Sequence, residues 1–265
     1  MNGWDAAITD HCAFARAGGI SEGTIRLRRL YLARFAEHVH HESPWGVTLD
    51  QLVDFLAHPG WEPETRKSAR SALRMFYRWA DATDRIRADP TRLLQAVRVP
   101  AGKPKPAPEA VIARAILAAD RRGRLMIYLA LLAGMRRHEI AKVHTDDIEG
   151  DELRVAGKGG RVRMLPLHPK LAEALAACEP GYVLPGRIDG HLSLGHVGKV
   201  LGRLLGPGWT GHCLRHTAAS RWYAVERDLV AVQELLGHAK PETTRRYTAV
   251  PDGAMRAAVF GAASA

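Results

Sequence analysis

Several short segments in the second half of the chain contain residue types that can together break a phosphodiester bond. Two guanidinium groups can hold both non-bridging oxygens through paired N–H donors and stabilise the charge that develops at phosphorus. A tyrosine hydroxyl can attack phosphorus when cationic neighbours or a base assist it, and a lysine can protonate the leaving oxygen. The residues that could supply this chemistry are Arg136, Lys158, His212, Arg215, His238 and Tyr247.

The segments around these residues predict a mainly helical domain with one small sheet. Two apolar-rich helices are expected at 110–119 and 125–133. Residues 153–155 and 162–165 flank a glycine-rich run that contains Lys158, which predicts a β-hairpin with that lysine at its turn. Helical patterns then continue to the end of the chain.

The first hundred residues predict a smaller, purely helical domain with four helices. The first covers residues 4–17 and ends at Gly18-Gly19, and Ser21 is expected to cap the second. Thr48 and Gln51 form a capping box for the third helix, which ends at Pro59-Gly60, and the fourth covers residues 63–80. The second helix is expected to bury a single apolar face, composed of Leu27, Leu30, Tyr31, Phe35 and Val39.

The fourth helix has one apolar face and one cationic face. At 100° per residue, the apolar face contains Ala69, Ala72, Leu73, Phe76 and Ala80. The cationic face contains Arg66, Lys67, Arg70, Arg74 and Arg78. Like charges at this spacing repel one another mildly, so a facing row of DNA phosphates explains the pattern better than helix stability does. The alternative is an arginine face that is simply solvated.

A proline-rich segment separates the two domains. Pro100, Pro104, Pro106 and Pro108 cannot continue a helix and favour an extended, semi-rigid chain. Lys103 and Lys105 are predicted to lie along a DNA backbone, with a solvated spacer as the alternative. The predicted organisation is a DNA-binding domain at 1–100, a linker at 101–107 and a catalytic domain at 108–265.

The bulk composition favours a polyanionic partner. The chain has 38 Lys+Arg against 28 Asp+Glu, which gives 38 − 28 = +10 and favours nucleic acid over an anionic membrane surface. Three widely spaced cysteines predict neither a disulfide framework nor a zinc site. The sequence has no nucleotide-binding loop, no metal-binding motif and no apolar stretch of membrane-spanning length. We therefore expect a cytoplasmic protein without a cofactor or metal.

The motifs in the second half resemble those of the tyrosine recombinase (phage integrase) family. Residues 131–140 resemble its first-arginine motif, in which a helix ends, a Gly-hydrophobic-Arg turn follows and a new helix begins. Residues 157–161 resemble its lysine hairpin, residues 212–218 its His-x-x-Arg box, residues 235–238 its Leu-Gly-His box, and residues 243–248 its nucleophile helix. The resemblance covers about residues 105–250, and the helical part before it is similar in size to the family's core-binding (SAM-like) domain.

The resemblance implies a site-specific recombinase that cleaves and rejoins DNA through a 3′-phosphotyrosyl intermediate, without ATP or metal. Tyr247 is then the nucleophile, and Arg136 and Arg215 bind the phosphate. His212, together with the arginines, provides the cationic or basic surroundings that the tyrosine hydroxyl needs for attack. Lys158 protonates the leaving oxygen, and His238 hydrogen-bonds the phosphate. His216 is interpreted as a support residue, and Glu139 is expected to orient Arg136 or a neighbouring amide. An Xer-like or compact integrase fits better than a large phage integrase.

The partners that the resemblance implies are duplex DNA with two inverted sites and further copies of the chain. The protein would be a monomer when free and a homotetramer in the synapse, with accessory proteins left open. The tail after Tyr247 is expected to dock either on a neighbouring protomer or on its own domain. A type IB topoisomerase and a DNA-binding regulator without turnover are the alternatives. Integration, excision and dimer resolution all stay open.

Overall fold

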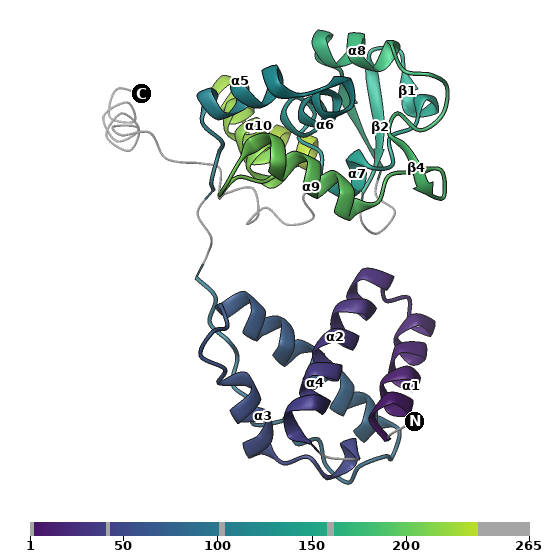
Figure 1. Cartoon of the computed structure of the whole chain (residues 1–265), viewed down its shortest axis with the longest axis vertical. Coiled ribbons are helices and arrows are strands. Elements are labelled where there is room, and N and C mark those ends of the chain that lie inside the picture. Colours follow the sequence, from purple (N-terminus) through teal and green to yellow (C-terminus); the bar gives the residue numbers. More distant parts are fainter. Residues whose placement is uncertain (1–2, 41–42, 101–103, 158–161, 238–265) are drawn as a thin grey trace, which may run out of the picture. The chain divides into compact units, whose positions relative to one another are not determined.

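The computed structural model describes residues 3–40, 43–100, 104–157 and 162–237. The chain divides into two compact units, Met1–Ala101 and Gly102–Ala265, each of which is described by itself (Figure 1). The predictions for Lys103, Lys158, His238, Tyr247 and the C-terminal tail concern residues outside the described ranges. The DNA-binding and catalytic roles expected of the two units stay predictions.

The N-terminal unit contains the four helices that the sequence predicts. They are α1 (Gly3–Ala17), α2 (Glu22–Val39), α3 (Leu49–Leu56) and α4 (Pro63–Ala82), with a short 3-10 helix at Pro44–Gly46. The predicted capping box is present, because Thr48 Oγ1 accepts from the Gln51 amide and the Gln51 side chain accepts from the Thr48 amide. Ser21 occupies the N-cap position of α2, but its hydroxyl contacts the Thr24 hydroxyl at 3.0 Å instead of a backbone amide.

The apolar face predicted for α2 is wrong in part. Tyr31 and Phe35 are buried as expected, but Leu27 and Leu30 are 44% and 45% exposed. The buried stripe runs instead through Ile25, Leu32 and Phe35. At 100° per residue, the buried residues Ile25, Tyr31, Leu32 and Phe35 fall within one arc of about 120°, whereas Leu27 and Leu30 lie outside that arc.

The apolar face of α4 forms the centre of the N-terminal unit. All five apolar residues predicted for this face, Ala69, Ala72, Leu73, Phe76 and Ala80, are buried. Trp4 of α1 stacks on Phe76, with ring centroids 5.9 Å apart. Alanines on α4 let neighbouring helices approach closely, while the large rings fill the space between them.

In the C-terminal unit a group of helices packs beside a small sheet, and helices and strands share one core (Figure 1). Its helices are α5 (Glu109–Ala118), α6 (Arg121–Leu131), α7 (Arg137–Ile140), α8 (Pro169–Ala176), α9 (Leu194–Leu205), α10 (Gly211–Glu226) and α11 (Leu229–Leu236), with a 3-10 helix at Thr145–Asp147. The mainly helical fold with a small sheet is therefore confirmed. In the part of the chain that the structure describes, no helix is long and apolar enough to cross a membrane.

The sheet contains the predicted hairpin and one strand that the sequence analysis missed. Strands β2 (Glu152–Ala156) and β3 (Val162–Pro166) pair antiparallel, and β1 (Ile148–Glu149) adds to the other edge of β2. A further short strand, β4 (Pro185–Ile188), lies outside this sheet. A strand of two residues is too short to show a period-two pattern, so β1 leaves no signal in the sequence.

Candidate active site

Arg136 is positioned by a turn that requires glycine. Gly134 has φ +58°, and a Cβ atom there would lie 2.7 Å from the Trp222 ring. Both the left-handed backbone and the close packing therefore exclude larger residues. The chain leaves α6, turns at Gly134, and places Arg136 in an extended conformation at the N-cap of α7, as the sequence motif predicts.

The carboxylate of Glu139 lies at the centre of an arginine cluster formed by Arg136, Arg163 and Arg215. Glu139 accepts from the Arg136 amide at 2.8 Å and from Arg136 Nη1 at 3.0 Å. It also accepts from Arg163 Nη1 and Nη2 at 3.1 and 2.9 Å, and Arg215 Nη1 lies 3.9 Å away. The expectation is that Glu139 orients Arg136 or a neighbouring amide, and Glu139 in fact binds both the guanidinium group and the amide of Arg136. Three guanidinium groups around one carboxylate leave an excess of positive charge.

The arginines hold Glu139 in its charged form although its side chain is fully buried. Burial by itself would raise the pKa of Glu139, but the hydrogen bonds and charge of Arg163, the Arg136 amide and the charge of Arg215 lower that pKa to about 2. The carboxylate is therefore ionised throughout the neutral pH range. A permanent negative charge at this point keeps the guanidinium groups in place.

The C-terminal end of α11 supplies a second set of acceptors for the same cluster. Its last carbonyl groups are left without helical partners and carry the negative end of the helix dipole, which favours cations. Each of the three arginines donates to a different one of these groups. The pairs are Arg163 Nε to Leu235 O at 3.0 Å, Arg215 Nη2 to Leu236 O at 2.6 Å and Arg136 Nη2 to Gly237 O at 3.5 Å.

Arg215 connects the sequence motifs of the site in space. Its side chain is buried at 1% exposure, and its Nη1 also donates to the carbonyl of Gly134. One guanidinium group thereby links the glycine turn, α10 and the end of α11. The structure brings Arg136, His212 and Arg215 together, and these are the predicted catalytic residues within the described ranges.

His212 lies at the start of α10, beside the cluster. Its Nε2 is 2.9 Å from Nε2 of His216, one helical turn further along. Burial, and then the charges of Arg215 and Arg136, lower the pKa of His212. The ring is therefore neutral at pH 7, which makes one of its nitrogens a donor and the other an acceptor.

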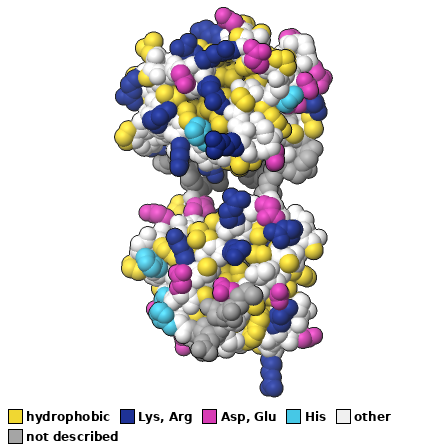
Figure 2. Space-filling model, turned by 45° about the vertical axis from the view of Figure 1, so that its right-hand side comes forward, with side chains coloured by type: hydrophobic (Ala, Val, Ile, Leu, Met, Phe, Trp, Pro, Cys, Tyr) yellow, Lys and Arg dark blue, Asp and Glu magenta, His cyan; other side chains and the backbone are white. Residues whose placement is uncertain are grey.

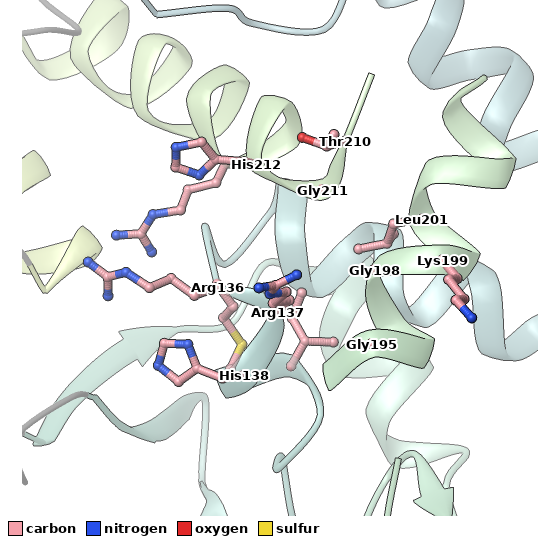
Figure 3. Close-up of a pocket in the computed structure, with 13 residues that line it drawn as sticks. Arg136, Arg137, His138, Gly195, Gly198, Lys199, Leu201, Thr210, Gly211 and His212 are labelled. Atoms are coloured by element: carbon pink, nitrogen blue, oxygen red, sulfur yellow. The ribbon is translucent and has the colours of Figure 1, made fainter. Parts of the chain in front are cut away.

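A cavity of about 690 Å³ opens beside these residues. Among the residues that the structure describes, no Asp or Glu lines this cavity. The charged and imidazole groups that line it belong to Arg136, Arg137, His138, Lys199, His212 and Arg215. In Figure 3 the side chains of Arg136, His138 and His212 point to the same side of the cavity, whereas Lys199 points away from them. Lys and Arg side chains also spread over the face of this unit seen in Figure 2. An anionic group is the natural occupant.

Sequence reasoning did not identify Arg163 as a site residue. Its side chain is only 11% exposed, and it connects Glu139 to α11. One signal was available: Arg163 stands two residues before Leu165 on β3, so the two side chains share a face of the strand, and Leu165 is buried. An arginine on an inward-facing strand position requires an anionic or carbonyl partner.

The predicted DNA-contacting residues of α4 divide into two groups. Arg66 donates to the carbonyls of Leu56 and His58 at 2.7 and 3.1 Å, so it holds the end of α3. Arg70 donates to the Leu94 carbonyl, and the Nε atoms of Arg70 and Arg74 are buried. Lys67 and Arg78 are exposed, with Lys67 at 3.7 Å from Glu64. Contact with DNA stays a prediction for all five.

Lys105 is bound within the C-terminal unit. Its Nζ donates to the Gly208 carbonyl at 2.9 Å and lies 4.7 Å from the centre of the Trp209 ring. These contacts explain the position of the side chain without DNA. Its predicted role along a DNA backbone stays untested.

Known proteins resemble this chain in sequence and in fold. The model of the phage integrase family matches residues 109–253. Tyrosine recombinase XerC of Rhodospirillum centenum is 31% identical, over 88% of this chain and 79% of the relative. Tyrosine recombinase XerC of Azotobacter vinelandii is also 31% identical, over 91% of this chain and 89% of the relative.

Two solved structures have the same fold at lower sequence identity. A lambda integrase dimer bound to a COC′ core site matches with a TM-score of 0.75 and 20% identity, over 92% of this chain and 76% of that one. The XerH site-specific recombinase in a post-cleavage complex with palindromic difH substrate matches with a TM-score of 0.70 and 21% identity, over 94% of this chain and 82% of that one.

Proposed function

The chain belongs to the phage integrase family of site-specific tyrosine recombinases, and on that premise we propose how its own residues carry out DNA cleavage and rejoining. The observation that carries the proposal is the cluster of Arg136, Arg163 and Arg215 around Glu139, next to His212. Three guanidinium groups held by one carboxylate retain a net positive charge. That charge suits a phosphodiester, which gains negative charge as it is attacked.

Arg136 and Arg215 bind the scissile phosphate in this proposal. Their guanidinium groups are oriented before DNA arrives, because backbone carbonyls and Glu139 already occupy part of their donors. Orientation in advance means that little reorganisation is needed as charge develops at phosphorus. Arg163 does not contact the phosphate. It donates hydrogen bonds to both Glu139 and the end of α11, and so fixes the position of one relative to the other.

Tyr247 attacks phosphorus and becomes linked to the DNA 3′ end, while the 5′ oxygen leaves. The phosphotyrosyl bond replaces one phosphate ester by another, so rejoining by the 5′ hydroxyl needs no external energy source. Lys158 gives a proton to the leaving oxygen, and His238 hydrogen-bonds the phosphate.

Duplex DNA with two inverted sites is the proposed substrate, with the N-terminal unit as a core-binding domain. The DNA-bound structures named above support this proposal, since one is a dimer on a core site and the other is a complex with a palindromic substrate. A protomer free in solution would be a monomer, and two pairs of protomers would form the synapse. The protein would act in the cytoplasm.

Covalent adduct formation tests the proposed function. Binding sites are first selected from a random duplex library with the full chain, and then nicked so that cleavage releases a short fragment and traps the intermediate. The wild-type chain should give a DNA adduct that survives denaturing electrophoresis, and Tyr247→Phe should give none. Tyr182→Phe is the matched control, since it removes one hydroxyl elsewhere in the same unit. Equal adduct from wild type and Tyr247→Phe would overturn the assignment of the nucleophile.

A further inference from the structure

The chain that enters the C-terminal unit is hydrogen-bonded to α10 beside His212. The backbone amide of Lys105 donates to Nδ1 of His216 at 2.8 Å. Two residues further on, the amide of Ala107 donates to the hydroxyl of Thr217 at 2.9 Å. Thr217 is buried, and its hydroxyl also bonds to the Cys213 carbonyl at 3.0 Å. The linker is thus fastened to the helix that carries His212 and Arg215.

The chemistry of these donors and acceptors fixes where the imidazole protons lie. A backbone amide can only donate, so Nδ1 of His216 must be unprotonated, and its single proton is on Nε2. This Nε2 is 2.9 Å from Nε2 of His212 and has a proton to donate. The accepting Nε2 of His212 is then unprotonated, and the proton of that neutral ring is on Nδ1.

We propose that His216 is a positioning residue that sets the tautomer of His212, and that the linker amide of Lys105 sets the tautomer of His216. The inference rests on the proposed function, because it concerns how His212 is prepared for the reaction. In the linker-bound state His212 acts as a hydrogen-bond donor through Nδ1–H. Its basic nitrogen is occupied by His216 and accepts no other proton.

The surroundings keep this arrangement in place at neutral pH. Burial and the charges of Arg215 and Arg136 lower the pKa of His212, so its ring does not take up a second proton there. The two rings also meet edge to face, with centroids 4.2 Å apart. The linker is therefore connected to His212 by two hydrogen bonds, one from the Lys105 amide to His216 and one from His216 to His212, and neither involves a charged group.

Two amide substitutions at His216 separate its two contacts. The asparagine side chain reproduces the position of Nδ1, so His216→Asn can still accept from the Lys105 amide but is too short to reach His212. The glutamine side chain reproduces the position of Nε2, so His216→Gln can still donate to His212. A purely structural role for His216 as an anchor of the linker predicts that Asn is the better replacement. The proposal that His216 sets the tautomer of His212, which we call the tautomer relay, predicts that Gln is the better replacement.

The first readout is the tautomer of His212 itself, measured by ¹⁵N long-range correlation spectra of the full chain. The His212 signals are assigned by their loss in His212→Gln. We expect a single Nδ1–H tautomer in the wild type and in His216→Gln, and a mixture in His216→Asn. The same mixture in the wild type, or an unchanged single tautomer in His216→Asn, would overturn the proposal. This readout needs no DNA cleavage, so it decides the relay even if the proposed function fails.

The second readout is single-turnover cleavage of the nicked duplex. We expect His216→Gln to cleave within about threefold of wild type. His216→Asn should be slower by about 10- to 100-fold, because His212 is then a fixed donor for only part of the time, and complete loss of one preorganised donor costs about 100- to 1000-fold. Equal rates for the two variants would contradict the relay. Thermal unfolding of both variants shows whether they are folded. If either is not, the His212 tautomer in the wild type and in the Lys105 variants below decides the question.

The linker half of the proposal has its own matched pair at Lys105. Lys105→Pro removes the backbone N–H that His216 accepts, whereas Lys105→Ala keeps it and removes only the side chain. Lys105→Pro should give the mixed tautomer at His212, and Lys105→Ala should give the single one. The same tautomer in both variants would show that the linker amide does not control His216.

Discussion

The carboxylate of Glu139 accepts hydrogen bonds from both terminal nitrogens of Arg163, at 3.1 and 2.9 Å. The same carboxylate holds the amide and the guanidinium group of Arg136. Arg163 thus shares a buried partner with Arg136, the residue that we propose binds the phosphate. We therefore expect the geometry of the proposed phosphate site to depend on a strand residue outside the recognised motifs.

Replacing Arg163 by Met should weaken both folding and cleavage. The change leaves part of the Glu139 charge uncompensated, and we expect the free energy of unfolding to fall by about 3 kcal/mol. Cleavage should slow by about 10- to 100-fold, because Glu139 is no longer held by Arg163 and therefore orients Arg136 less firmly. Urea unfolding and single-turnover cleavage measure the two effects.

Arg154→Met on the neighbouring strand is the control for that experiment. Arg154 is 47% exposed and pairs with Asp147 and Glu149, so its loss should cost about 1 kcal/mol or less and leave cleavage unchanged. If the two variants lost similar amounts of stability and cleavage rate, the Arg163–Glu139 contact would contribute no more than an exposed ion pair does.

Stability should decline in acid as Glu139 takes up a proton. Its pKa in the folded chain is about 2, against an ordinary value of 4.5, so the carboxylate stabilises the fold above pH 4.5 and loses this effect as the pH falls toward 2. The shift corresponds to roughly 3 kcal/mol. Urea unfolding between pH 6 and pH 3 should show about 2 kcal/mol of this loss in the wild type and a smaller loss in Glu139→Gln. Parallel curves would rule out the low pKa.

Gly237 should tolerate alanine less well than a glycine of the same conformation does. Gly237 and Gly150 have φ +60° and +64°, so alanine is strained by about 1 kcal/mol at each. A Cβ at Gly237 would also lie 2.9 Å from Arg163 Nη1, whereas nothing lies within 4 Å at Gly150. Gly237→Ala should therefore lose about 2 kcal/mol and some cleavage, and Gly150→Ala about 1 kcal/mol and none. Unfolding curves that coincide would show that the contact with Arg163 is unimportant.

The cationic face of α4 should separate into stabilising and DNA-contacting residues. Lys67→Gln and Arg78→Gln should each lower the dependence of DNA affinity on salt by about one phosphate contact, with little change in melting temperature. Arg66→Gln should lower the melting temperature, because Arg66 holds the carbonyls at the end of α3. Binding titrations at several KCl concentrations measure the first effect. An unchanged salt dependence in both exposed variants would remove α4 from the DNA interface.

The sequence was sufficient for features that depend on local pattern. The glycine turn before Arg136, the hairpin at β2 and β3, and the apolar face of α4 all follow from residue types at short spacing. The prediction that Leu27 and Leu30 are buried is wrong, because helical periodicity does not state which of two adjacent apolar stripes of α2 the other helices cover. Packing against α1 and α4 decides it.

The relationships that connect distant segments could not be predicted. Lys105 and His216 are 111 positions apart, and their hydrogen bond depends on the course of a linker whose prolines indicated only an extended chain. The alternation of side chains along β3 predicts that Arg163 faces inward, but it does not identify the partners of Arg163, which lie on α7 and α11. Tertiary packing brings these groups together, and no local propensity encodes that packing.

The end of α11 also determines when the site can exist during protein synthesis. Arg136, Arg163 and Arg215 donate to carbonyls that are added to the chain 101, 72 and 21 residues after them. Because ribosomes add about 5–20 residues per second, Arg136 waits for several seconds before its last acceptor has been made. We therefore expect a nascent chain that ends before α11 to be unable to hold a phosphate in this geometry.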